Sequence, residues 1–133
     1  MGHLPGAQDV KWIPVLIYGP VRDVIHAWPL EVKKELGSVL TRLQKGESVG
    51  MPDVRPMPNI GAGASEIRIG ERGRQYRAIY AIRMEFGILL FHAFQKKSRT
   101  MLEREKKTAR DRLEDFLKEL GEAPDETKRS KGR

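Results

Sequence analysis

The stretch "SEIRIGERGRQYRAIYAIRMEFGILLFHAFQKKSR", residues 65–99, contains three short β-type segments in close succession. These segments are "EIRIG", "QYRAIYAIRM" and "GILLFHAF", and the short sequences "ERGR" and "EFG" separate them. Strands joined by such short connections pair most readily as an antiparallel meander. We therefore expect a small antiparallel sheet at the centre of the fold.

Two helical patterns precede this stretch. The first stops before Pro29 and places four apolar residues on one face: Val21, Val24, Ile25 and Trp28. The second covers residues 30–44 and stops before Gly46. A β-rich segment, residues 11–18, comes before both helices. Residues 48–65 contain so many prolines and glycines that they predict a long surface loop.

A third helical pattern follows the strands. Thr100 and Glu103 have the spacing of a capping box and predict the start of this helix, which we expect to end at Gly121. Its charged residues, between 103 and 118, are typical of an exposed face with i,i+4 pairs. The order β-α-α-β-β-β-α predicts an α+β fold in which the helices pack on one face of the sheet and leave the other face partly open.

Composition limits the classes of protein that fit. The 133 residues suffice for one domain, residues 10–120, between a flexible leader, residues 1–9, and a disordered tail, residues 121–133. The net charge of +7 favours a polyanionic partner, although such an excess can also serve solubility alone. The absence of cysteine excludes disulfides and thiolate chemistry, and the three histidines are too scattered to form a metal site.

The same composition sets expectations for cofactors and location. The only N-terminal apolar run is too short to span a membrane, and it lacks the layout of a signal peptide. We therefore expect a cytoplasmic protein with no membrane association, no metal and no small-molecule cofactor.

Strand alternation predicts where the charges of the meander point. The tyrosine face of the middle segment is the better core face, so Arg77 projects from the opposite face. By the same argument Glu66 and Arg68 lie beside Arg77 if the first two strands pair, and Lys96 and Lys97 arrive at the end of the third segment. The alternative is a solvated polar face in which Glu66 partly neutralises Arg68.

A phosphodiester would satisfy this cluster of cations. Arginine can hold two phosphate oxygens at once and stabilise a pentacoordinate transition state, whereas lysine acts as a movable charge or a proton donor. His92 suits acid or base chemistry near neutral pH, but a structural, hydrogen-bonded histidine is the alternative. "GAGAS", residues 61–65, is not a dinucleotide fingerprint, because it lacks the third glycine and precedes a strand.

In their order and spacing, "YRAIY" and "HAFQKK", followed by "TARDRL", resemble the phage Gp49-like branch of HigB toxins in the RelE/ParE superfamily. The resemblance covers roughly residues 11–120. It implies a RelE/ParE-like fold and the toxin of a type II toxin–antitoxin pair. Such toxins are metal-independent endoribonucleases that cut messenger RNA in the ribosomal A site through the RNA 2′-hydroxyl. The implied partners are therefore messenger RNA on the ribosome and a cognate antitoxin, a helix-turn-helix protein.

The resemblance also implies roles for individual residues. Arg77 matches the arginine of the family's "YR" motif, which holds the scissile phosphate, and Lys97 with Lys96 matches the basic pair that neutralises charge or assists the leaving 5′-oxygen. Arg68 lies where the superfamily often has basic residues. His92 of "FHAF" matches a family histidine that either does chemistry or supports the strand.

Two departures and two alternatives accompany the resemblance. The last helix lacks the Thr-Pro start that is frequent in the family, and no tyrosine follows Tyr80, so a catalytic tyrosine near that helix is missing. Two other functions are alternatives: a non-enzymatic gyrase inhibitor of ParE type, and a plain basic nucleic-acid-binding module. For Phe94 the sequence leaves two roles open: stacking on an RNA base, or packing in the core. The predicted catalytic residues are Arg77, Lys97, Lys96 and His92, and the predicted RNA contacts are Arg68, Arg72, Arg74, Phe94 and Arg99.

Overall fold

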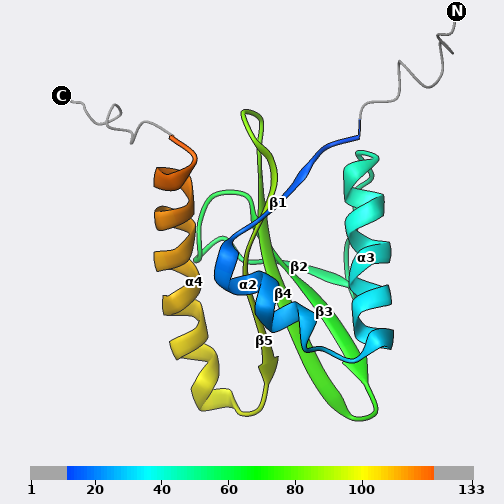
Figure 1. Cartoon of the computed structure of the whole chain (residues 1–133). Coiled ribbons are helices and arrows are strands. Elements are labelled where there is room, and N and C mark those ends of the chain that lie inside the picture. The colour runs from blue at the N-terminus through cyan, green and yellow to red at the C-terminus, as the bar shows by residue number, and fades with distance from the viewer. Residues whose placement is uncertain (1–11, 122–133) are drawn as a thin grey trace, which may run out of the picture.

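The computed structural model describes residues 12–121 and confirms the α+β class (Figure 1). Its elements are β1 (Val15–Ile17), α2 (Gly19–His26), α3 (Leu30–Gln44), β2 (Val54–Pro56), β3 (Ala64–Glu71), β4 (Arg74–Arg83), β5 (Gly87–Lys96) and α4 (Arg99–Glu119). The predicted leader, residues 1–9, and residues 122–133 of the predicted tail lie outside the described residues. Within residues 12–121, no helix is both long and apolar enough to cross a membrane.

The five strands form one sheet in the order β1-β5-β4-β3-β2. The predicted antiparallel meander of β3, β4 and β5 is confirmed. The prediction of a wholly antiparallel sheet is wrong at β1, which pairs in parallel with β5 so that Val15 lies opposite Ile88. Parallel neighbours need a long crossover, and the chain between β1 and β5, which includes two helices, provides one.

The predicted long loop, residues 48–65, contains a short edge strand. β2 pairs antiparallel with β3, and Arg55 lies opposite Glu66. Proline is tolerated in an edge strand because its missing amide is not needed there for a second neighbour. Pro56 in β2 therefore does not prevent the pairing.

Apolar side chains cover both faces of the sheet. The first core lies between the sheet and the helices α2 and α3, and its helical residues are Val21, Val32, Leu36, Val39 and Leu43. The second core lies beneath α4, and it joins Ala109, Leu113 and Phe116 to Ile79, Ala81, Leu89 and Phe91. Figure 1 shows α3 and α4 on opposite sides of the sheet.

The prediction that all helices share one sheet face is therefore wrong. The second face also carries an apolar surface, and water contact with that surface costs free energy until α4 covers it. A β-bulge contributes to this second core. Tyr80 pairs with Leu90 and Ile79 pairs with His92, so Phe91 is the extra residue of β5.

Two residues separate the end of β5 from the start of helix α4. The N-cap is Ser98, whose hydroxyl oxygen accepts a hydrogen bond from the backbone amide of Met101 at 3.2 Å. The predicted capping box of Thr100 and Glu103 is therefore wrong, because Thr100 already lies inside the helix. The predicted end is confirmed, since Gly121 follows the last turn with a φ of 84°.

Candidate functional site

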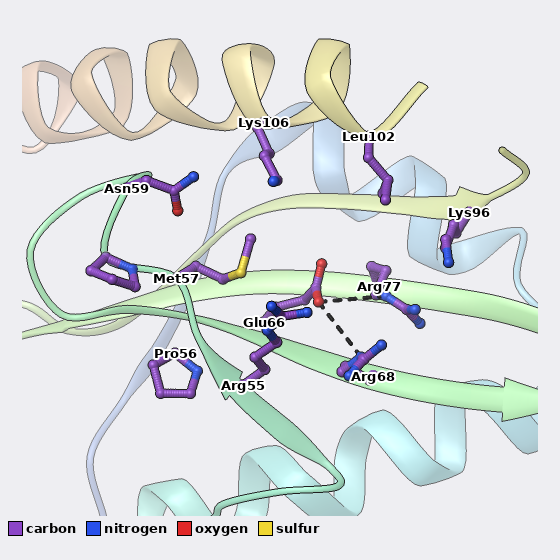
Figure 2. Close-up of a pocket in the computed structure, with 11 residues that line it drawn as sticks. Arg55, Pro56, Met57, Asn59, Glu66, Arg68, Arg77, Lys96, Leu102 and Lys106 are labelled. Carbon is purple, nitrogen blue, oxygen red and sulfur yellow. Dashed lines mark ion pairs between the residues drawn. The ribbon is translucent and has the colours of Figure 1, made fainter. Parts of the chain in front are cut away.

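A cavity of about 270 Å³ lies between the start of α4 and the sheet (Figure 2). Its lining comes from β2 and the segment after it, β3, β4, β5 and α4. Five cationic side chains line this cavity, and we call them the cavity cations: Arg55, Arg68, Arg77, Lys96 and Lys106. Among the described residues, Glu66 is the only carboxylate of the lining. The cavity is therefore suited to bind an anion.

Glu66 and two arginines form the floor of the cavity. Arg68 and Arg77 lie directly opposite each other on β3 and β4, as the strand pairing predicted. The Oε1 atom of Glu66 is 3.5 Å from Nε of Arg77 and 3.7 Å from Nε of Arg68. Like charges in opposed strand positions repel each other, and one buried carboxylate between them offsets part of that repulsion.

Arg77 is held in place although it is almost completely buried, with 3% of its surface exposed. Its Nη1 donates to Oε1 of Gln75 at 3.3 Å and to the carbonyl oxygen of Tyr76 at 3.4 Å. Burial lowers the pKa of the guanidinium from its ordinary value; Glu66 opposes this change, and Arg68 and Arg55 add to it. A bound anion would oppose the lowering in the same way as Glu66, because it favours the charged guanidinium.

The other cations come from three separate elements. Lys96 is half-buried at the end of β5, and Arg55 is exposed on β2. Lys106 projects from α4 toward the cavity, as Figure 2 shows, and its Nζ is 3.4 Å from Oε2 of Glu103. The site thus collects charges that lie up to 51 positions apart, from Arg55 to Lys106.

Sequence reasoning missed Arg55 and Lys106. Arg55 lay in the predicted loop, where no strand alternation could assign it a face. Lys106 belongs to a helix that was interpreted as an exposed charged face. A signal was nevertheless present, because Lys106 lies four residues after Leu102 and three before Ala109, on the inward face of α4.

Four basic residues among the predicted RNA or phosphate contacts do not line the cavity. They are Lys97, Arg72, Arg74 and Arg99, all of them exposed. Arg72 occupies the turn between β3 and β4 with a φ of 52°, and its Nε lies 3.2 Å from Oε2 of Glu71. Phe94 belongs to the second core, with 7% of its surface exposed. The cavity therefore brings together only Arg77, Lys96 and Arg68 of the predicted residues.

His92 lies under α4 and outside the cavity lining. Its Nδ1 accepts from Nη1 of Arg112 at 3.0 Å, because a guanidinium can only donate. The proton therefore resides on Nε2, which donates to Oε1 of Glu105 at 2.6 Å. Burial lowers the pKa of His92; the hydrogen bond to Glu105 opposes this change and the charge of Arg112 adds to it. This geometry favours the structural interpretation of His92, as a connection between β5 and α4.

Comparisons with known proteins identify one family. Residues 23–114 match the family described as "Phage derived protein Gp49-like (DUF891)". This range covers more than half of the chain and includes all five cavity cations and Glu66. Comparison with curated proteins and with solved structures finds no match. Among residues 12–121, no group of three or more histidine, aspartate or glutamate side chains has an arrangement that could hold a metal ion.

Proposed function

Because this chain belongs to the phage-derived Gp49-like family, part of the RelE/ParE-like toxin superfamily, we propose that it is a HigB-type toxin that cleaves messenger RNA on the ribosome. Family membership supports a toxin of a toxin–antitoxin pair. The cavity with its five cations is the observation that carries the nuclease activity. The substrate implies a cytoplasmic location. The proposed antitoxin is a helix-turn-helix protein encoded beside the toxin, and it covers the cavity.

In this proposal the scissile phosphate occupies the floor of the cavity. Arg77 and Arg68 approach it from adjacent strands, and Lys96 approaches it from the end of β5. Guanidiniums fixed before the reaction stabilise the additional negative charge of a pentacoordinate phosphorus more than they stabilise the ground state. Glu66 keeps both arginines side by side while the cavity is empty of RNA.

The proposed reaction needs only the chain, its RNA and water. The 2′-oxygen passes its proton to water and forms a bond to the adjacent phosphorus, and the bond from phosphorus to the 5′-oxygen breaks. The products are a 2′,3′-cyclic phosphate and a 5′-hydroxyl. The leaving 5′-oxygen requires a proton, and Lys96 is the candidate donor because its ammonium lines the cavity, whereas His92 does not.

The test compares cleavage of messenger RNA in a translating extract by the parent chain and two variants. Lys96→Ala and Arg77→Lys each alter one cavity cation, and Arg77→Lys keeps a charge beside the buried Glu66. We expect each to reduce cleavage about 100-fold or more, since loss of one transition-state donor typically has that effect. Arg42→Ala is the matched control, because Arg42 is exposed on α3 and pairs with Glu47. Circular dichroism establishes that each variant is folded.

Two outcomes contradict the proposal. One is cleavage at the parent rate by folded Lys96→Ala and Arg77→Lys variants. The other is growth arrest with intact messenger RNA and DNA-damage signalling, which would instead indicate the gyrase inhibitor of ParE type. Mapping of the RNA ends provides a further check, because the proposed reaction leaves cyclic phosphate ends.

A further inference from the structure

The two ends of the cavity differ in chemistry. Figure 2 shows Arg77 and Lys96 at one end, and Met57 and Asn59 at the other. Guanidinium and ammonium groups suit a phosphate. The opposite end, by contrast, joins the apolar side chains of Met57 and Pro58 to the amide of Asn59. An apolar surface beside a single amide is suited to the face and edge of an RNA base.

The segment that presents Asn59 is anchored on both sides. Met57 and Ile60 are buried in the second core, with 8% and 5% of their surfaces exposed. The backbone amide of Met57 donates to the carbonyl oxygen of Ala64 at 2.9 Å, and the amide of Ile60 donates to the carbonyl oxygen of Met57 at 3.0 Å. Asn59 is exposed between these two buried anchors. Its position at the cavity is therefore fixed by the core.

Two further contacts hold the segment from behind. A Cβ added to Gly61 would lie 2.7 Å from Cδ2 of Leu113, so the backbone at this position packs closely against α4. Nη1 of Arg83 donates to the carbonyl oxygen of Ala62 at 2.6 Å. A side chain selects between bases only if its donor and acceptor are held at fixed places. These anchors supply that condition for the backbone that carries Asn59.

We propose that this end of the cavity binds the unpaired RNA base next to the scissile phosphate, and that Asn59 determines which base is preferred there. The proposal rests on the nuclease function proposed above. The amide offers one acceptor and two donors, so it pairs with two adjacent atoms on a base edge, and the wrong base leaves one of these groups unpaired. Met57 and Pro58 contact the face of the base and supply little selectivity.

The test is a map of cleavage sites for the parent, Asn59→Ala and Asn59→Asp in the same translating extract. We expect the parent to favour particular bases at one position beside the cut. Asn59→Ala reduces that preference about fivefold or more, since a good two-point contact discriminates by at least that factor. Asn59→Asp replaces the donor with a second acceptor and shifts the preference to another base. Ser48→Ala, an exposed change outside the cavity on the same connection from α3 to β3, keeps the parent map.

The outcomes separate this inference from the proposed function. The inference alone is overturned if both Asn59 variants cleave with the parent's base frequencies at every position. It is also overturned if the parent cleaves without preference, or if folded Asn59→Ala does not cleave at all, because Asn59 would then act in the reaction itself. If the parent chain cleaves no RNA, both the nuclease function and the inference are wrong.

Discussion

Glu66 pairs with both Arg68 and Arg77; Glu66 and Arg77 are buried, whereas Arg68 is only partly buried. Strand alternation assigned all three to one sheet face, and the pairing of β3 with β4 brings Arg68 opposite Arg77. Alternation did not show that Arg77 is buried, because burial depends on α4, which follows more than 20 residues later. A substitution of Arg77 therefore tests folding as well as function, which is why the charge-preserving Arg77→Lys is the more informative change.

His92 could not be placed by alternation, because the bulge at Phe91 interrupts the period of two along β5. A strict period would put Leu90 and His92 on the same face. Instead Leu90 packs in the first core, whereas His92 contacts Glu105 and Arg112 of α4. The resemblance to a family with a histidine at this position leaves both roles open. The geometry favours support of the strand.

The depressed pKa of His92 predicts an acid-dependent loss of stability. The folded chain holds the imidazole neutral, whereas an unfolded chain protonates it below its ordinary pKa of 6.5. Below that pH the unfolded state binds more protons, so the free energy of unfolding decreases as pH falls from 6.5 toward the lower pKa of the folded state. Above pH 6.5 the contribution of the neutral imidazole is complete.

Urea denaturation at a series of pH values between 7.5 and about 5 gives the free energy of unfolding at each pH. The slope of this free energy against pH measures the dependence. We expect His92→Gln to be less stable than the parent at pH 7.5 and to lose part of the parent's pH dependence, because Gln does not titrate. His26→Gln is the matched control, since His26 is exposed at the end of α2. Identical pH slopes for the parent and His92→Gln would contradict the assignment.

At the scale of elements, the helices and strands with a long periodic pattern could be predicted, whereas the pairing of the short strands could not. The helix at residues 30–44 and the meander follow from local periodicity, and both are confirmed. β1 and β2 have three residues each, and their pairing partners lie far along the chain or across a proline-rich segment. No local pattern specifies that β1 runs parallel to β5, because tertiary packing decides it.

The start of α4 illustrates how two local signals compete. Thr100 with Glu103 has the spacing of a capping box, but Ser98 has the extended backbone of an N-cap, with a φ of −159°, and accepts from Met101. We expect Ser98→Ala to lower the free energy of unfolding by about 1 kcal/mol, because an amide of the first turn loses its acceptor. Thr100→Ala should cost less than half as much, since Thr100 is exposed inside the helix.

Urea denaturation of both variants at one pH provides this comparison. Both changes convert a small hydroxyl residue to alanine within three positions, so each variant is the control of the other. A larger loss from Thr100→Ala than from Ser98→Ala would restore the capping box and contradict the observed helix start.

At the scale of the whole molecule, the site exists because α4 closes over a sheet face that already carries cations. Arg68, Arg77 and Lys96 come from the meander, and α4 adds Lys106 as the roof of the cavity. The sequence predicted an open basic face. A partly covered cavity excludes more water than an open face, and charge interactions within it are correspondingly stronger. The apolar stripe of α4 that makes the second core is therefore also what completes the site.

Because the net charge is +7, RNA binding could reflect the overall charge of the chain instead of the cavity. A matched pair of lysines distinguishes these two explanations. Lys106 lines the cavity, whereas its neighbour Lys107 is exposed and its Nζ lies 3.2 Å from Oδ2 of Asp111. Replacement of either lysine by alanine removes one positive charge. If RNA binding reflects the overall charge, the two variants behave alike; if it reflects the cavity, only Lys106→Ala weakens binding.

The salt dependence of binding distinguishes these cases. The ligand is a short RNA with a 2′-deoxy residue at the cleavage position, so that it binds without being cut. Each phosphate contact to a single strand contributes about 0.7 to the slope of log affinity against log salt. We expect Lys106→Ala to reduce the magnitude of the parent slope by about 0.7. Lys107→Ala should leave it unchanged, because its ammonium faces solvent. Equal reductions of the slope for both variants would mean that RNA binds to the basic surface as a whole. The proposal that the cavity binds the phosphate would then be wrong.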